Sequence, residues 1–258
     1  MTLPVLVINR DVDRDRWDHS LSAALKQGVE PLRLPAIDAH DAAFRARDHA
    51  DLIGPVFWGH DTIKPGALGC FLSHRAAWTK VIDLDSPAAL ILEDDADLTE
   101  PPDRVADVLA STRCDLLFVN DRMADWVRAT GIPGTSVVLD GLIRSLAGSG
   151  GPSAHGVRRA PGGDAYAVTR VGARRLLRIT EQTKIVCGAD WAMIWAALPR
   201  GMVVNGIEEL KILDATTPRP HRPILAYAMA KPAAALRKGP SVLKHSIEVP
   251  IASLLEHE

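Results

Sequence analysis

The stretch Pro87-Ala-Ala-Leu-Ile-Leu-Glu-Asp-Asp95 joins an apolar run to three consecutive carboxylates, Glu93, Asp94 and Asp95. The apolar part predicts a buried strand, and in open α/β sheets a ligand site lies beyond the carboxyl ends of the strands. Clustered carboxylates repel one another and are costly to bury without a counter-charge. A hard divalent cation such as Mn²⁺ or Mg²⁺ removes both problems, because it takes carboxylate oxygens and keeps coordination positions open for phosphate. We therefore expect a metal site here, while the triplet alone leaves open a solvated acidic turn.

Strand and helix signals alternate on both sides of this stretch. Short apolar, β-branched runs predict strands over residues 3–8, 32–37, 88–92, 115–120 and 165–169. Helical spacing of apolar residues, with glycine or proline near several ends, predicts helices over residues 13–27, 66–84, 101–110, 172–179 and 190–198. This β-α-β order indicates the α/β class, with a mostly parallel sheet flanked by helices.

The composition is that of an ordinary globular protein. The chain has 258 residues and a formal net charge of −2, so no basic excess points to nucleic acid. No apolar run approaches the ~20 residues that span a bilayer, and the N-terminus lacks the basic start of a signal peptide. Cys70, Cys114 and Cys187 lack metal or disulfide spacing and are interpreted as small core residues in a reducing compartment. We expect a cytoplasmic enzyme or binding protein.

Two boundaries are predicted along the chain. Residues 1–215 are expected to form one domain, and residues 216–258 a basic, proline-rich C-terminal tail or appendage. Within the domain, residues 131–163 are rich in glycine and are interpreted as a flexible loop. A long loop inside a compact domain is usually functional or mobile, so this segment is expected to matter for the site.

The segment Gly66-Ala-Leu-Gly-Cys-Phe-Leu-Ser-His74, followed by Leu90-Ile-Leu-Glu-Asp-Asp95, strongly resembles glycosyltransferase family 25. That family includes bacterial lipopolysaccharide and lipooligosaccharide galactosyltransferases and the procollagen galactosyltransferases. The resemblance covers roughly residues 3–200, and several motifs in one order match by chance far less often than a single one. Further segments that agree are Val7-Ile8-Asn9 with Asp13-Arg14, Arg33 to Asp38, Gly163 to Val168 with Gly172 to Leu177, and Asp190-Trp191.

The sequence departs from the family pattern in two places. Gly162-Gly163-Asp164 stands where Gly-Thr-Asp is common, and the tail has no usable match. Both regions are expected to contact the acceptor.

The resemblance implies a GT-A-like, Rossmann-type fold and an inverting transferase that uses UDP-galactose and Mn²⁺. The acceptor it implies is a bacterial surface glycan of the lipopolysaccharide type. A lipid-linked acceptor would bring the enzyme into peripheral contact with the inner membrane face.

Two other classes stay open. One is a non-catalytic scaffold that binds nucleotide sugars. The other is a metal-dependent phosphoryl-transfer or phospho-receiver protein, which would place a carboxylate pair at the end of the first strand, where Asn9 stands.

The resemblance and the chemistry of the triplet together assign roles to the carboxylates. Asp95 is the predicted direct metal ligand, and Asp94 or Glu93 is expected to contribute through ribose or a metal-bound water. Inversion needs one base on the acceptor hydroxyl; Asp190 is the leading prediction and Asp164 the rival. Asp190 would equally serve as the N-cap of the helix that follows it.

Further donor-binding residues are predicted on the first strand and on the helix before the triplet. Asn9 and Arg14 are expected to contact the nucleotide, although Arg14 would equally form a surface ion pair. His74 and Ser73 are expected to face the diphosphate or donor sugar, and a core hydrogen-bonding role is the alternative for His74. Gly66 would let the backbone approach the donor, with tight helix packing as the alternative.

Overall fold

The fold is known for most of the first two thirds of the chain and for short segments beyond. The computed structural model describes residues 3–53, 63, 65–112, 115–120, 136–139, 143–145, 163–185, 188–190, 192–193 and 225–228. Most of the predicted loop and of the predicted tail lie outside these residues.

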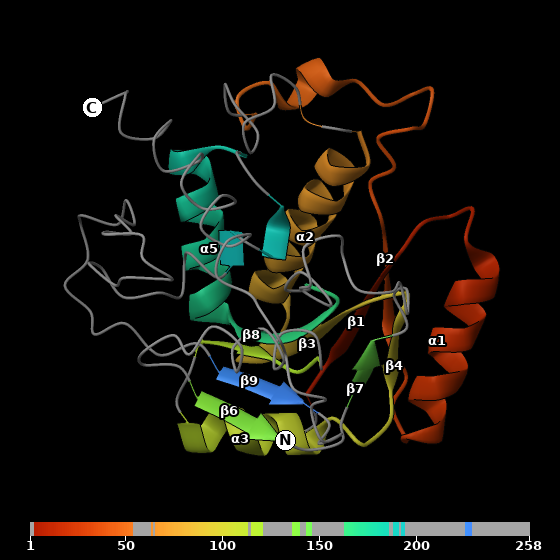
Figure 1. Ribbon diagram of the computed structural model, residues 1–258, viewed down its shortest axis with the longest axis vertical. Helices are drawn as coiled ribbons and strands as arrows, with labels where there is room; N and C mark the ends of the chain where they lie inside the picture. Colours follow the sequence, from red (N-terminus) through yellow and green to blue (C-terminus); the bar gives the residue numbers. More distant parts are fainter. Residues whose placement is uncertain are drawn as a thin grey trace, which may run out of the picture.

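The centre of the fold is a sheet with seven strands among the described residues, in the order β2-β1-β3-β8-β5-β9-β6 (Figure 1). Every neighbouring pair is parallel except the two pairs that contain β8, so β8 alone runs against the other strands. The strands are β1 (Val5–Asn9), β2 (Leu32–Pro35), β3 (Ala88–Glu93), β5 (Leu116–Phe118), β6 (Ser136–Leu139), β8 (Ala165–Thr169) and β9 (Leu225–Ala228).

Helices cover both faces of this sheet. On one face lie α2 (Pro65–Asp83) and α5 (Arg170–Thr183), and on the other lie α1 (Arg14–Lys26) and α3 (Asp103–Thr112) (Figure 1). A second, two-stranded sheet pairs β4 (Ala96–Leu98) with β7 (Ile143–Ser145), and a short 3₁₀ helix occupies Ala46–His49.

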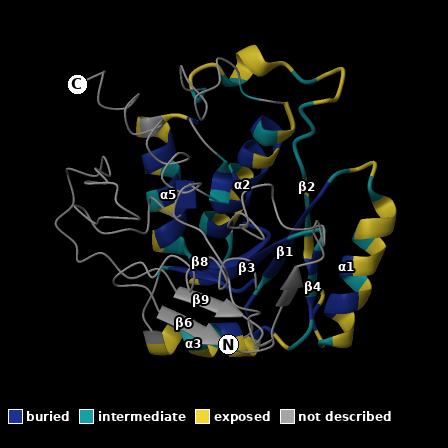
Figure 2. Cartoon of the chain, in the orientation of Figure 1, coloured by how far each residue is buried: buried dark blue, intermediate teal, exposed yellow. Residues whose placement is uncertain are grey.

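The strands at the centre are buried on both faces, which explains their continuous apolar sequences (Figure 2). Along β1, Leu6 and Ile8 pack in the cluster that includes α2 and α5, while Val5 and Val7 pack in the cluster that includes α1 and α3. This alternation is the two-residue period of a strand applied to two covered faces. Burying each such side chain contributes about 1.5–3 kcal/mol.

Helix α2 lies unusually close to the chain that follows β2. A Cβ on Gly69 would stand 2.5 Å from the carbonyl oxygen of Ile37, so only glycine fits at this crossing. The neighbouring turn ties the two segments together, because the Ser73 hydroxyl accepts a hydrogen bond from Ile37 N–H (2.8 Å) and donates to Gly69 O (2.7 Å). The start of α2 is therefore fixed against the edge of the sheet that carries the site.

Most predicted elements through residue 120 and over residues 165–179 are confirmed, including the mostly parallel sheet and the stop of α1 just before Gly28, which has φ +76°. The loop interpretation of residues 131–163 is wrong for two segments, because residues 136–139 and 143–145 form β6 and β7. Residues 225–228, beyond the predicted boundary at 215, form β9 between β5 and β6. The boundary itself stays a prediction.

Candidate functional site

The predicted site residues converge because of the strand directions. Strand β1 ends at Asn9 and its neighbour β3 ends at Glu93, with Ile8 paired to Glu93. Strand β8 runs the opposite way and therefore begins at this same edge, where Glu93 N–H donates to Asp164 O (2.8 Å). Two strand ends and one strand start thus bring an amide and several carboxylates to one place.

Asn9 organises the first part of this edge. Its buried side chain donates from Nδ2 to Asp94 Oδ2 (2.8 Å) and to the carbonyl oxygen of Asp13 (2.9 Å). Its Oδ1 accepts from Arg33 Nε (2.8 Å). Because both ends of the amide are engaged, Asn9 fixes the position of Asp94, and its predicted contact with the nucleotide stays a prediction.

Asp94 is neutralised by the protein itself. Its Oδ1 accepts from Arg16 Nη1 (3.1 Å), while its Oδ2 is held by Asn9. The predicted metal and donor roles of Asp94 stay predictions. The hydrogen bonds show that Asp94 also links β1 and α1 to the end of β3.

Asp95 has the opposite environment. Its Oδ1 is buried and has no hydrogen-bond partner among the described residues. Burial, followed by the negative charges of Glu93, Asp164 and Asp94, raises the pKa of Asp95 to about 6, and Arg16 offsets this only in part. A half-buried carboxylate with an unpartnered oxygen and mostly negative neighbours fits a divalent cation, so the donor set here suits the metal that the sequence predicts.

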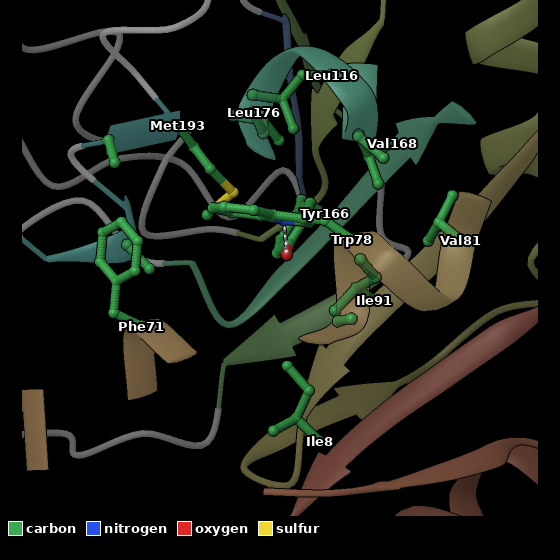
Figure 3. Packing of buried hydrophobic residues seen from close by; sticks show 14 of the residues in the cluster. Ile8, Phe71, Trp78, Val81, Ile91, Leu116, Tyr166, Val168, Leu176 and Met193 are labelled. Atoms are coloured by element: carbon green, nitrogen blue, oxygen red, sulfur yellow. Dashed lines mark hydrogen bonds between the residues drawn. The ribbon is translucent and has the colours of Figure 1, made fainter. Parts of the chain in front are cut away.

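Glu93 ends a hydrogen-bonded chain that reaches into the core. Its Oε1 lies 3.0 Å from His74 Nε2, and His74 Nδ1 lies 2.9 Å from the Tyr166 hydroxyl. The same hydroxyl accepts from Trp78 Nε1 (2.8 Å), a contact drawn in Figure 3 among the surrounding apolar side chains. The ring of His74 is thus fixed at both nitrogens, and so is the carboxylate that it contacts.

The charge state of this chain follows from its surroundings. Burial lowers the pKa of His74, but Tyr166, the Cys70 thiol and the Glu93 carboxylate together raise it well above its usual value. Burial raises the pKa of Tyr166, so its hydroxyl keeps its proton. The core hydrogen-bonding role of His74 is confirmed, and its contact with the diphosphate or donor sugar stays a prediction.

His74, Glu93 and Asp94 line a cleft of about 330 Å³, whereas Asn9 and Asp95 stand next to lining residues without being among them. Its walls are the end of β1, residues 36–40 after β2, the first half of α2, and Glu93 with Asp94. Two cations, Arg10 and Arg16, stand in the lining, and Arg10 is itself paired with Asp13 (2.6 Å) and Asp38 (3.1 Å). The volume is within the range of small-molecule sites, and the cations suit an anionic ligand.

The structure brings most of the predicted donor-binding residues to this cleft. Gly66, Ser73 and His74 line it together with Glu93 and Asp94. Arg14 is exposed at the start of α1 and is not among the lining residues.

Sequence reasoning missed Arg16, Arg33 and Tyr166. Arg16 was the easiest of the three to find, because it lies on the same predicted helix as Arg14. Nothing local pointed to the contact between Arg33 and Asn9, because it depends on the pairing of β1 with β2.

The two predicted bases lie near one another. A Cβ on Gly163 would stand 3.7 Å from Asp190 Cβ, so Asp190 packs beside the residue that precedes Asp164. Asp164 is buried and Asp190 is half-buried. The N-cap alternative for Asp190 is wrong, because the helix there begins at Ala189, and Ala192 N–H donates to Gly188 O (3.1 Å). The role of each carboxylate as a base stays a prediction.

Cys70 corrects one expectation from composition. It is exposed and lines the cleft, so its interpretation as a core residue is wrong. Cys114, Cys187 and Trp191 lie outside the described residues.

A family model described as glycosyltransferase family 25 (LPS biosynthesis protein) matches residues 2–129. Residues 2–129 belong to glycosyltransferase family 25. The matched segment contains β1, α2 and β3, and so carries Asn9, His74 and the carboxylate triplet. Asp164 and Asp190 lie beyond it. A comparison with curated proteins gives no match. None of the described helices is long and apolar enough to cross a membrane.

Proposed function

We propose that this chain is a metal-dependent, inverting glycosyltransferase with a GT-A-like fold. Its donor is a UDP-sugar, UDP-galactose first, and its acceptor is a bacterial surface glycan of the lipopolysaccharide type. The family match supports sugar transfer, and the buried, unpartnered Oδ1 of Asp95 is the observation that supports the metal. The order of the sheet, with one reversed strand beside β3, is consistent with the fold. The enzyme would act in the cytoplasm, in peripheral contact with the inner membrane face.

The metal site is built on Asp95. Asp95 would hold Mn²⁺ or Mg²⁺ with help from Asp94 or Glu93, and the neighbouring charge of Asp164 adds to the negative potential there. The bound cation supplies Lewis acidity toward the departing diphosphate. The protein's own part is to hold Asp95 in place, and the backbone hydrogen bond between Glu93 and Asp164 fixes the two strand ends for this.

The donor would enter the cleft between β1 and α2. Arg16 lies beside Asp94 at its wall and would favour the negatively charged diphosphate. His74, held by Tyr166 and Glu93, would present a fixed edge to the sugar or phosphate. Such preorganisation lowers the cost of ordering the site when the donor binds.

Asp190 is the proposed base. Asp164 is buried near Asp95, where its charge would serve the cation, whereas Asp190 is half-buried and packs against Gly163. Asp190→Asn is expected to lower kcat by about 10²–10⁴-fold, which is the usual contribution of a general base, with donor binding unchanged. Asp164→Asn would instead weaken metal and donor binding. A normal kcat in Asp190→Asn would remove the base role.

The decisive experiment is a donor screen. The purified chain is incubated with UDP-galactose, UDP-glucose, their N-acetyl forms and UDP-uronates, and UDP release is measured with Mn²⁺ or with EDTA. We expect release with one donor, its loss in EDTA, and its loss in Asp95→Ala. Full activity of Asp95→Ala would overturn the metal role, and nucleotide-induced stabilisation without any turnover would indicate a non-catalytic scaffold. A phosphorylated protein intermediate would indicate phosphoryl transfer.

A further inference from the structure

A second group of potential metal ligands lines the cleft and does not include Asp95. Cys70 and His74 are one turn apart on α2, and Glu93 ends the neighbouring strand β3. One ligand atom from each of these three residues lies within 4.8 Å of the other two. Residues four apart on a helix share a face, so the helix and the strand end present three ligand atoms to one point.

The spacing suits a tetrahedral ion. Two nitrogen or oxygen ligands bound at about 2.0–2.1 Å to a tetrahedral Zn²⁺ stand about 3.3 Å apart. His74 Nε2 and Glu93 Oε1 are already 3.0 Å apart. An ion between them would therefore require movements of only a few tenths of an ångström.

The ring of His74 is already oriented as a metal-binding histidine is. Metal-bound histidines donate their other ring N–H to a fixed partner, which sets the tautomer and the ring angle. Here the partner is the Tyr166 hydroxyl oxygen, 2.9 Å from Nδ1, and this hydroxyl is itself fixed by Trp78 Nε1 (2.8 Å). With an ion on Nε2, the proton sits on Nδ1 and is donated to Tyr166.

An ion has access to this group from solvent. Cys70 is exposed, and the Glu93 side chain retains 32% of its exposure, while His74 is buried behind them. All three residues line the cleft, so a fourth coordination position would face its interior. Three protein ligands with one open position are the pattern of open zinc sites.

We propose that Cys70, His74 and Glu93 form a binding site for Zn²⁺ that does not use Asp95. A thiolate, an imidazole and a carboxylate prefer Zn²⁺ or Co²⁺, whereas Mn²⁺ and Mg²⁺ prefer oxygen ligands alone. The thiolate and the carboxylate together balance the charge of the ion. Sequence spacing could not reveal this site, because its third ligand comes from a strand 19 residues beyond His74.

Cobalt provides a direct test, because a thiolate bound to Co²⁺ gives a charge-transfer band in the near ultraviolet. The reduced, chelator-free full chain is titrated with Co²⁺ and then with Zn²⁺. We expect the band to appear with one equivalent of Co²⁺ and to disappear as Zn²⁺ displaces it. Cys70→Ser should abolish the band, while Cys114→Ser and Cys187→Ser, the matched controls, should retain it.

Two further variants separate the sites. Asp95→Asn should keep the band, and Glu93→Gln should raise the Kd for Zn²⁺ by at least about tenfold, since even residues that only orient metal ligands cost 10–100-fold when changed. Circular dichroism of Cys70→Ser, whose side chain is exposed, checks that the variant is folded. Cobalt binding without a thiolate band, or a band that survives in folded Cys70→Ser, would overturn the proposal. No donor or acceptor is used, so this outcome is independent of transferase activity.

Discussion

At the scale of single residues, the three adjacent carboxylates of the triplet have different hydrogen-bond partners and charged neighbours. Asp94 is held by Asn9 and Arg16, and Glu93 contacts His74, but Asp95 is left with an unpartnered buried oxygen. The sequence predicted the cluster and its place at a strand end. It could not predict which carboxylate lacks a partner, because the partners come from β1, α1 and α2, far away in the chain.

The raised pKa of Asp95 predicts an unusual pH dependence for the metal-free protein. Asp95 in the fold titrates near pH 6, above its value in the unfolded chain. Between about pH 4 and pH 6 the folded chain therefore retains a proton that the unfolded chain has released, so this residue makes the free energy of unfolding fall as the pH rises. The usual aspartate with a lowered pKa acts in the opposite direction.

Asp95→Asn removes this titration. In EDTA at pH 7 we expect the variant to be more stable than the wild type by about 1 kcal/mol, after allowing for partial solvent screening, and to show no such gain near pH 4. Thermal unfolding at the two pH values measures the difference. A gain in stability that is equal at both would show that the Asp95 charge is not its source.

Tyr166 carries a second prediction at this scale. Tyr166→Phe removes the oxygen that accepts from Trp78 Nε1 and contacts His74 Nδ1, so it leaves buried polar groups without their partner. We expect a loss of about 1–3 kcal/mol in the free energy of unfolding. Denaturant unfolding measures it, with Tyr227→Phe, at the only other tyrosine of the chain, as the control. Equal stability of Tyr166→Phe and wild type would mean that this hydrogen-bonded chain contributes nothing net.

At the scale of elements, the sequence predicted the helices and strands whose pattern is set by neighbouring residues. It missed the short strands that depend on distant pairing partners. The apolar runs of β1 and β3 and the helical period of α1 and α2 were predictable, because each is set by residues a few positions apart. The short strands β4, β6, β7 and β9 were not, because a strand of three or four residues exists through its pairing partner and carries little pattern of its own. Their partners lie far away in the sequence.

Two glycines of α2 give a matched pair at this scale. A Cβ on Gly69 would meet the carbonyl oxygen of Ile37 at 2.5 Å, whereas a Cβ on Gly66 would meet only His40 Nε2 at an ordinary 3.6 Å. Gly66→Ala is therefore expected to be neutral or stabilising by up to ~1 kcal/mol, through helix propensity. Gly69→Ala is expected to destabilise by about 1–3 kcal/mol, because the backbone must move.

Urea unfolding of both variants measures this difference. It also tests the tight packing of Gly69 against residues 37–39. If Gly69→Ala were as stable as Gly66→Ala, the close crossing of α2 over residues 37–39 would not exist in solution.

At the scale of the whole molecule, the site depends on the order of the sheet. Because β8 is antiparallel and lies next to β3, its first residues stand beside the last residues of β3. The sequence indicated a mostly parallel sheet but not which strand was reversed, since direction is set by connections and by neighbours rather than by composition. Sequence pattern alone therefore could not predict that Asp164 lies beside the triplet.

This dependence couples ligand binding to global stability. The residues expected to hold metal and donor stand on β1, α2 and β3 and beside β8, so ligand bound among them stabilises the cooperative core as a unit. A ligand present at 100 times its Kd adds about 2.7 kcal/mol to the free energy of unfolding. We expect Mn²⁺ with UDP to raise the Tm by several degrees, and either ligand alone to raise it by less, because each supplies part of the other's site.

Differential scanning fluorimetry at pH 7.5 measures these shifts, with Asp95→Asn and Arg14→Ala as the two comparisons. Asp95→Asn should lose the joint shift, because it removes the carboxylate on which the cation depends. Arg14→Ala should keep it, because Arg14 is exposed and is not among the residues lining the cleft. A joint shift that persists unchanged in Asp95→Asn would place the cation elsewhere, and the orphaned Oδ1 of Asp95 would then need another partner.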